Sequence, residues 1–502
     1  MAMFDLALLL GALVALLAAM AARIGSRLGL PALLLFLLVG MLLGPVGFGV
    51  QFNDPDLAHG LGFSALVLIL AEGGLSTRWS TIRPALAPAV LLATVGTAVS
   101  IGAMTLFGHL ALGLSWTVAA LLGAVTAPTD SAAVFSVLRG VPLPARVRSV
   151  LEAESGLNDA PTVLVVIAMS GLATGHPPHG GLVGLLASIV LELAGGILVG
   201  LVIGWVGVRV SRQVSLPSSS LYGLVAVCWA VLAYGAAVQV HVSGFAAVYV
   251  AAVLVGNSDL PYRHATASFA EGVGWMSQIG LFVMLGLLAN PDRLTWGSVG
   301  EGVAAGMFLT FVARPLSVVL CTAGFRTPWR HQAFLSWAGL RGAVPIILAT
   351  IPMSDHLDHA DKLFDVVLVL VVVFTVLQGP TLPAVGAALG LVDPDAARDV
   401  DIEVAPLDEI DAELIQVHVP LESRLVGVTV HELRMPRNAV VSLVIRGDES
   451  FAPHAETVLR PEDELLIVTP AQHRRAVAER LTEIGRAGRL ARWNGVRVRA
   501  EE

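Results

Sequence analysis

Two acidic residues of this chain stand inside stretches that otherwise have the hydropathy of membrane-spanning helices. Asp130 closes the segment 126–130, which also contains Pro128, and Asp159 follows Asn158 in the next apolar stretch. A charge at that depth is expensive and is usually functional, and irregular backbone is tolerated there only where it is buried in protein or lines a wet cavity. These residues predict an ion site within the membrane.

The two acids define the chemistry that such a site could perform. Carboxylates placed close together and poorly solvated repel each other, so at least one of them accepts a proton near physiological pH. A bare monovalent cation relieves the same repulsion and competes with that proton. Thr129, Ser155 and Asn158 add neutral oxygens of the kind that hard cations take as ligands. We therefore expect the exchange of a proton for an alkali cation.

A polar stripe accompanies Asp159 along one predicted helix. Glu152, Ser155 and Asp159 share a helix face through i, i+3 and i+4 spacing, and Glu154 and Asn158 form an adjacent row. The stripe therefore faces the protein interior. The alternative interpretation is a purely structural network of buried salt bridges.

Two of the apolar stretches are interrupted in a way that could position these side chains. Pro128 removes a backbone hydrogen bond and frees carbonyl groups, and the stretch 332–354 is broken by two glycines and Pro345 around Arg341. Two interrupted spans in corresponding places of two halves indicate inverted repeats of a transporter. We expect the breaks to cross, with their opposed helix dipoles compensated by Asp130 and Arg341.

The rest of the chain supplies a membrane scaffold for these elements. Hydrophobic residues make up 56% of the chain and charged residues only 14%, far from an ordinary soluble domain. Arg23 and Arg27 directly follow the first apolar run, which predicts an anchored helix rather than a removed signal peptide. We predict about thirteen membrane helices, at 4–22, 30–49, 57–76, 84–108, 114–138, 150–173, 180–208, 219–238, 240–257, 271–290, 299–323, 332–354 and 363–390.

The basic residues of the short loops predict the orientation of these helices. One alternate set of loops carries only Arg293 and Lys362. The other carries twelve arginines: Arg23, Arg27, Arg78, Arg83, Arg139, Arg146, Arg148, Arg209, Arg212, Arg263, Arg326 and Arg330. Positive residues favour the cytoplasm, so we expect the N-terminus outside and the C-terminal hundred residues in the cytoplasm. The formal net charge of -8 argues against a nucleic-acid partner.

Hydropathy changes after Leu391, which ends the predicted transmembrane domain, residues 1–391. We interpret 392–411 as an acidic linker, 412–485 as a small soluble α+β domain, and 486–502 as a basic tail that is either solvated or docked on anionic lipid headgroups. Alternating patterns predict three strands and a final helix. The strands are expected at Glu413–Val419, Ala439–Arg446 and Glu464–Thr469, a helical turn near Val430–Leu433, and the helix at Ala471–Ile484.

At these residues the chain resembles an NhaP-type antiporter of the monovalent cation:proton antiporter-1 family, and within it the potassium/proton subgroup. The resemblance covers roughly residues 1–391. It is carried by the segments Leu70-Ala71-Glu72-Gly73-Gly74-Leu75, Thr129-Asp130, Leu151-Glu152-Ala153-Glu154-Ser155-Gly156-Leu157-Asn158-Asp159-Ala160, Gly339-Leu340-Arg341-Gly342-Ala343 and Leu377-Gln378-Gly379.

The resemblance implies roles for individual residues. Asp159 would carry the cation and the proton, helped by ligands at Thr129, Ser155 and Asp130, while Glu72 and Asn158 also match the family pattern. The pair Glu154 and Arg341 would stabilise the core. Ser131 stands where the family usually has proline, so the break is expected to be shifted by part of a turn.

The segment 413–484 resembles a TrkA-C (RCK-C) regulatory domain, carried by Leu421-Glu422-Ser423-Arg424-Leu425-Val426-Gly427 and Leu459-Arg460-Pro461-Glu462-Asp463-Glu464-Leu465. Such domains pair and bind small ligands, and a nucleotide or cyclic dinucleotide is a candidate effector. No Gly-x-Gly-x-x-Gly follows a strand, which argues against direct NAD binding. The alternative is a module that only dimerises.

Together these features predict an all-α polytopic membrane protein with an NhaA/NhaP-like fold and a cytoplasmic α+β domain. We expect a homodimeric antiporter of the bacterial inner membrane, neither an enzyme nor cofactor-dependent, that exports potassium against proton entry and moves six core helices against a scaffold. The Asn158-Asp159 pair implies electroneutral exchange. Sodium/proton exchange is the alternative; a gated cation channel would need a carbonyl filter such as Thr-Val-Gly-Tyr-Gly, which the sequence lacks.

Overall fold

The computed structural model divides the chain into two compact units after Leu391. It describes residues 9, 11–21, 31–45, 47–50, 52, 54–138, 143–175, 181–258, 260, 262–289, 291–391, 401–407, 412–421, 423–436, 438–447 and 449–488. Most of the predicted basic tail and most of the predicted linker lie outside these residues.

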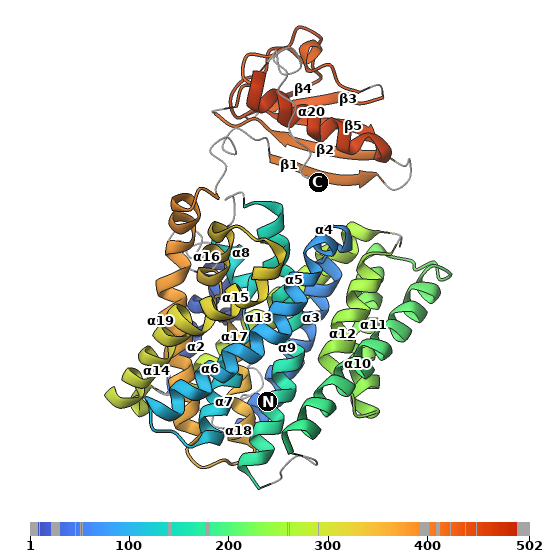
Figure 1. The fold of residues 1–502 in the computed structure, drawn as a ribbon. Coiled ribbons are helices and arrows are strands. Elements are labelled where there is room, and N and C mark those ends of the chain that lie inside the picture. The colour runs from blue at the N-terminus through green and yellow to red at the C-terminus, as the bar shows by residue number, and fades with distance from the viewer. Residues whose placement is uncertain are drawn as a thin grey trace. The chain divides into compact units, whose positions relative to one another are not determined.

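The first unit is built of packed helices (Figure 1). They are α2 (Ala32–Leu43), α3 (Pro55–Ser76), α4 (Trp79–Ile82), α5 (Leu86–Leu91), α6 (Thr97–Leu110), α7 (Trp116–Thr126), α8 (Ser131–Val137), α9 (Ala145–Ala173), α10 (Gly181–Ser211), α11 (Ser219–Gln239), α12 (Gly244–Gly256), α13 (Arg263–Leu288), α14 (Trp296–Phe308), α15 (Arg314–Thr322), α16 (Trp329–Trp337), α17 (Ala343–Leu348), α18 (Thr350–Ser354) and α19 (Ala360–Ala388).

Local sequence signals explain where several of these helices begin and how they pack. The side chains of Asp54, Ser115 and Ser243 accept hydrogen bonds from the first backbone N–H groups of α3, α7 and α12, which satisfies donors that have no partner within the helix. Gly40 and Gly286 let α2 and α13 approach closely, since a Cβ atom at Gly40 would lie 2.9 Å from the Cα of Gly286.

Eight helices of the described part are long and apolar enough to cross a membrane, and the pair α7 and α8, bent by 45°, raises the number to nine. Two of the eight are continuous through short elements, at Trp79–Leu110 and Trp296–Phe325. Shorter apolar helices lie at Gly11–Ala21, Ala32–Leu43, Gly244–Gly256 and Ala343–Ser354. The structure is thus mostly helical as expected, while the count of thirteen spans stays a prediction.

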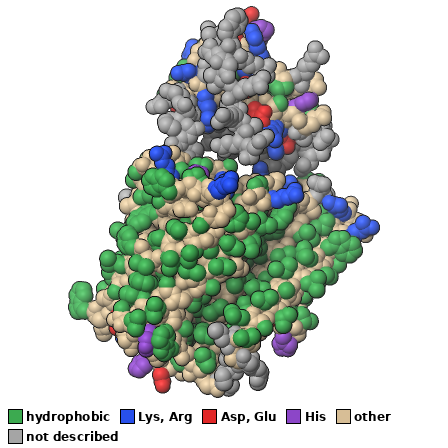
Figure 2. Space-filling view, viewed as in Figure 1, with side chains coloured by type: hydrophobic (Ala, Val, Ile, Leu, Met, Phe, Trp, Pro, Cys, Tyr) green, Lys and Arg blue, Asp and Glu red, His purple; other side chains and the backbone are tan. Residues whose placement is uncertain are grey.

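The surface of the helical unit has the distribution of a membrane protein. Apolar side chains cover its flank, and arginines gather at one end (Figure 2). The exposed tryptophan and leucine side chains on that flank, such as Trp205 and Leu198, would be unfavourable in water. Exposed arginines of the described loops and helix ends in this unit are Arg78, Arg83, Arg146, Arg148, Arg209, Arg212, Arg263, Arg326 and Arg330.

The second unit is a five-stranded antiparallel sheet with the order β1-β2-β5-β3-β4 and a helix, α20 (Arg474–Ala487). The strands are β1 (Asp401–Leu407), β2 (Ala412–His418), β3 (Val440–Arg446), β4 (Glu449–Phe451) and β5 (Glu464–Pro470). Val477, Leu481 and Ile484 of α20 share a buried core with Ile415 and Ile467 of the central strands. The predicted α+β architecture is therefore present.

Strand β1 corrects one boundary, because it falls inside the segment 392–411 that we interpreted as a linker. Its residues pair with β2 from Asp401 opposite His418 to Leu407 opposite Ala412. The acidic residues and Pro406 lowered its apparent strand character, but β1 is an edge strand. Edge strands tolerate charge and proline because one side of their backbone makes no ladder hydrogen bonds.

A buried ion pair fixes the turn before β5. Asp463 is fully buried and accepts two hydrogen bonds of 2.8 Å from the Arg446 guanidinium and one of 2.7 Å from the Arg460 N–H. Burial alone would raise the pKa of Asp463, but these hydrogen bonds outweigh it and hold the pKa below the usual value. The carboxylate therefore stabilises the folded unit at neutral pH.

Candidate ion-binding site

The two interrupted helices meet at their breaks. Helix α7 ends at Thr126 and α8 begins at Ser131. The second break lies between the end of α16 at Trp337 and the start of α17 at Ala343. The backbone N–H of Asp130 donates to the carbonyl of Leu340 over 2.9 Å, so the two breaks lie directly against each other.

Asp130 caps the helix that starts at the first break. Its carboxylate accepts hydrogen bonds from the N–H groups of Ala132 (2.9 Å) and Ala133 (3.2 Å), and the Ser155 hydroxyl accepts one from the N–H of Ser131 (3.0 Å). A negative charge at a helix N-terminus is favourable. The expected compensation of this helix end by Asp130 is confirmed.

Arg341 lies at helix C-terminal ends, which are opposite in polarity to the N-terminal end that Asp130 caps. Its buried side chain donates from Nε to the carbonyl of Thr126, the last residue of α7, over 3.1 Å, and from Nη1 to the carbonyl of Gly339. The hydroxyl of Thr375 in α19 donates to the Arg341 carbonyl over 3.0 Å. A cation at helix C-terminal carbonyls is favourable, so the expected position of Arg341 beside the first break is also confirmed.

The ion pair of the core differs from the expected one. Glu154 pairs with Arg314 of α15 and not with Arg341; both Arg314 Nη atoms donate to the Glu154 carboxylate, one of them over 2.9 Å. The side chains of Glu154 and Arg314 are 2% and 5% exposed. The family pattern placed an arginine at 341 beside Glu154 but could not show which of two buried arginines makes the bidentate contact.

The polar stripe of α9 reaches the breaks from the other side. Asn158 donates to the Thr129 hydroxyl over 2.8 Å, which ties the stripe to the first break. Asp159 is 5% exposed, and its Oδ1 atom has no hydrogen-bond partner. An uncompensated buried carboxylate oxygen is costly, so this position gains most from a bound proton or cation.

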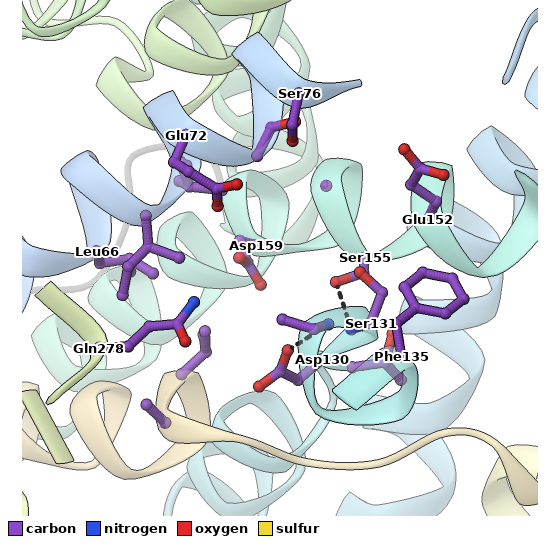
Figure 3. A pocket seen from close by; sticks show the side chains of 18 of the residues that line it. Leu66, Glu72, Ser76, Asp130, Ser131, Phe135, Glu152, Ser155, Asp159 and Gln278 are labelled. Atoms are coloured by element: carbon purple, nitrogen blue, oxygen red, sulfur yellow. Dashed lines mark hydrogen bonds between the residues drawn. The ribbon is translucent and has the colours of Figure 1, made fainter. Parts of the chain in front are cut away.

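A cavity of about 380 Å³ lies beside these groups (Figure 3). Five of the predicted site residues line it, namely Glu72, Thr129, Asp130, Ser155 and Asp159. In Figure 3 the side chains of Asp130 and Asp159 face one space from different helices, and Glu72 reaches it from α3. Asn158, Glu154 and Arg341 are not among the lining residues and act on the site only through their neighbours.

Sequence reasoning missed four polar residues that line the same cavity: Gln278 of α13, Tyr249 of α12, Ser76 at the end of α3 and Thr77 directly after it. Each is an isolated polar group within or at the end of an apolar helix, so no spacing or motif marks it. Only the packing of α12 and α13 against α3 brings them to the acids.

The oxygen atoms around this cavity are suited to a transported cation. Carboxylates, hydroxyls and a side-chain amide surround the space, and within the part of the chain that the structure describes no three His, Cys, Asp or Glu side chains are grouped to hold a metal ion. Interrupted helices around a buried acid are the arrangement of a secondary transporter.

Comparisons with known proteins identify the family. The profile described as "Sodium/hydrogen exchanger, transmembrane" matches residues 12–388, so the chain belongs to this family, and the TrkA-C domain profile matches residues 414–482. The chain is similar to the K(+)/H(+) antiporter NhaP of Alkalimonas amylolytica, with 36% identity over 438 residues, 86% of this chain and 75% of the relative.

Two further proteins extend this comparison. The K(+)/H(+) antiporter NhaP2 of Shewanella oneidensis is 32% identical over 464 residues, 91% of this chain and 80% of the relative. The solved sodium proton antiporter MjNhaP1 from Methanocaldococcus jannaschii has a TM-score of 0.65 at 22% identity, over 75% of this chain and 99% of that one. The helical unit thus has the fold of that antiporter.

Proposed function

We propose that this protein exchanges a monovalent cation for a proton at Asp159, with potassium as the exported ion and sodium as the alternative. The observation that carries the proposal is the buried Asp159 carboxylate, whose Oδ1 atom is unpaired beside a cavity shared with Asp130, Ser155 and Thr129. Potassium is favoured because two similar relatives are named K(+)/H(+) antiporters and a TrkA-C domain is present.

The proposed cycle follows from competition at this acid. A proton on Asp159 satisfies the carboxylate while the site faces outside; the proton leaves toward the cytoplasm and a cation replaces it before the site returns. Thr129, Ser155 and Asp130 supply further oxygens, and Glu72 attracts the ion at the cavity wall. Asn158 orients Thr129 through their hydrogen bond. With one carrier acid, exchange of one cation for one proton is electroneutral.

We further propose the membrane arrangement expected from the sequence. Thirteen spans in two inverted repeats would be formed by the eight long helices, the bent pair as one span, and the four shorter apolar helices. The end with exposed arginines would face the cytoplasm of a bacterial inner membrane, with the N-terminus outside. The assembly would be a homodimer, whose moving core would be stabilised by the ion pair of Glu154 with Arg314 and by the contacts of Arg341 with the backbone of the breaks.

The domain boundaries and the regulation are proposals as well. Residues 1–391 would transport the ion and residues 412–485, joined by the segment before them, would regulate it. Support comes from the TrkA-C match at 414–482. A nucleotide or cyclic dinucleotide is the proposed class of effector.

Transport by purified protein in proteoliposomes tests the proposal. Potassium, sodium and lithium are compared at several pH values, with a pH-sensitive dye inside the vesicles, and Asp159→Asn is the test variant. We expect cation-dependent proton movement in the wild-type protein and none in the variant. Exchange retained by Asp159→Asn would exclude Asp159 as the carrier, and cation flux without proton movement would indicate a channel.

A further inference from the structure

Tyr249 of α12 lies beside the ion cavity without an assigned role. Its side chain is 7% exposed, and its hydroxyl makes no hydrogen bond in the structure. A buried hydroxyl without a partner is energetically unfavourable, whereas phenylalanine would fill the same volume without that cost. The hydroxyl is therefore unfavourable in the conformation seen here.

The tyrosine ring packs on the backbone of α9 at Gly156. A Cβ atom at Gly156 would lie 2.5 Å from the Tyr249 hydroxyl oxygen and 2.6 Å from its Cζ atom, so any larger residue at this crossing would displace the end of the tyrosine ring. Gly156 stands four residues after Glu152 and three before Asp159, which places all three on one face of α9. The Thr77 side chain and the carboxylates of Glu152 and Asp159 are the polar groups near the Tyr249 hydroxyl, and none of them makes a hydrogen bond to it in the present state.

This crossing joins two groups of helices. Helix α12 packs mainly on α3, α10 and α11. Helix α9 packs mainly on α7, on α5 and on the helical segment Leu92–Gly96 that directly follows α5. If the protein is the antiporter proposed above, one helix group must move against the other to expose the site alternately to the two sides. The contact between Tyr249 and Gly156 then lies on the sliding surface.

The direction of movement determines which carboxylate reaches Tyr249. The cavity extends from Asp159 past Glu152 to Arg148 near the start of α9 and to Ser76 at the end of α3. To close that side of the cavity and open the other, α9 must move along its own axis, toward its C-terminal end, relative to α12. A shift of one helical turn, about 5.4 Å, brings Glu152 level with the place that Gly156 now occupies, where its side chain meets the hydroxyl end of the tyrosine ring and the ring turns aside.

We propose that Tyr249 is a positioning residue for transport, which donates its hydroxyl hydrogen bond to the Glu152 carboxylate once the site faces the opposite side. In the present state the tyrosine ring packs on Gly156 and its hydroxyl has no hydrogen-bond partner. In the opposite state the hydroxyl and the carboxylate satisfy each other and stabilise that state.

A double-mutant cycle in proteoliposomes tests the pair. Tyr249→Phe, Glu152→Gln and the double variant are compared with Tyr234→Phe, a control on α11 whose side chain is not among the cavity-lining residues. A hydrogen bond to a charged group is worth a factor of about ten or more, so each single variant should lose about tenfold in turnover with the KM for potassium unchanged. The double variant should lose no more, and the control should match wild type.

Two results would overturn the pairing. The first is a double variant whose loss of turnover is the product of the losses in Tyr249→Phe and Glu152→Gln. The second is wild-type turnover in Tyr249→Phe. If Tyr249 were merely structural, Tyr249→Phe would lower the melting temperature, whereas we expect this variant to keep or raise it, because it removes a buried hydroxyl that has no partner. A cross-linking experiment starts from a chain in which the two native cysteines are removed by Cys228→Ala and Cys321→Ala. Cysteines introduced by Glu152→Cys and Tyr249→Cys should then form a disulfide that stops exchange until it is reduced. Failure to cross-link would also overturn the inference, while absence of wild-type exchange would contradict the proposed antiport itself.

Discussion

Replacing Glu154 by glutamine should strongly destabilise the helical unit. The Arg314 guanidinium, with its side chain 5% exposed, donates two hydrogen bonds to this carboxylate and one more, of 3.3 Å, to the Leu335 carbonyl. Removing one partner of a buried ion pair leaves an uncompensated charge and costs about 3–5 kcal/mol. At roughly 2 °C per kcal/mol for a unit of this size, the melting temperature should fall by about 6–10 °C.

Thermal melts in detergent, followed by fluorescence-detected size-exclusion chromatography, measure this change. The matched control is Lys362→Met, which breaks the more exposed pair with Glu301 and should cost at most about 1 kcal/mol. The double variant Glu154→Leu with Arg314→Met removes both charges and should recover most of the loss. A shift for Glu154→Gln no larger than the control's, or no recovery in the double variant, would refute the reasoning.

Three other predictions follow from individual contacts. Asp130→Asn keeps an oxygen that can cap α8 and should lose exchange while keeping the melting temperature, whereas Asp130→Ala should also lose about 1 kcal/mol of stability; equal melts would contradict this. Gly342→Ala should abolish exchange, because a Cβ atom there would overlap the Asp130 carboxylate; normal exchange would show that the break adapts. Arg446→Met should reduce hydrogen-exchange protection of β5 at pH 7. The difference should begin to shrink as the pH falls below about 4, the ordinary pKa of an aspartate, and should be lost as the pH falls through the lower pKa of folded Asp463; a difference independent of pH would exclude the ion pair as its cause.

Much of the candidate site follows from the sequence because its signals are local. Pro128 and the glycines around Arg341 mark breaks in otherwise continuous apolar helices, and the spacing of Ser155 and Asp159 places both on one helix face. The structure brings Ser155 and Asp159 to one cavity together with Thr129 and Asp130, which directly follow Pro128, while Arg341 caps a neighbouring helix end. Local chemistry at a break and helical periodicity are sufficient for such predictions.

The remaining features depend on contacts between distant segments. Arg314 is a single charge in an apolar stretch, and its pairing with Glu154 requires α15 to pack beside α9. Tyr249 and Gln278 carry no motif and reach the cavity only through tertiary packing. Strand β1 was missed because its acidic residues and Pro406 disguise it in the sequence, and only its backbone pairing with β2 reveals it. Pairings of this kind have no periodicity that a single sequence reveals.

The most direct test of the central claim measures the apparent KM for potassium in proteoliposomes over a series of pH values. If a proton and the cation compete for Asp159, the apparent KM should rise as the pH falls, approaching about tenfold per pH unit for one proton, while the maximal rate is preserved at saturating potassium. An apparent KM that stays constant while the maximal rate falls would mean that the proton and the cation bind at separate sites, and would contradict the account.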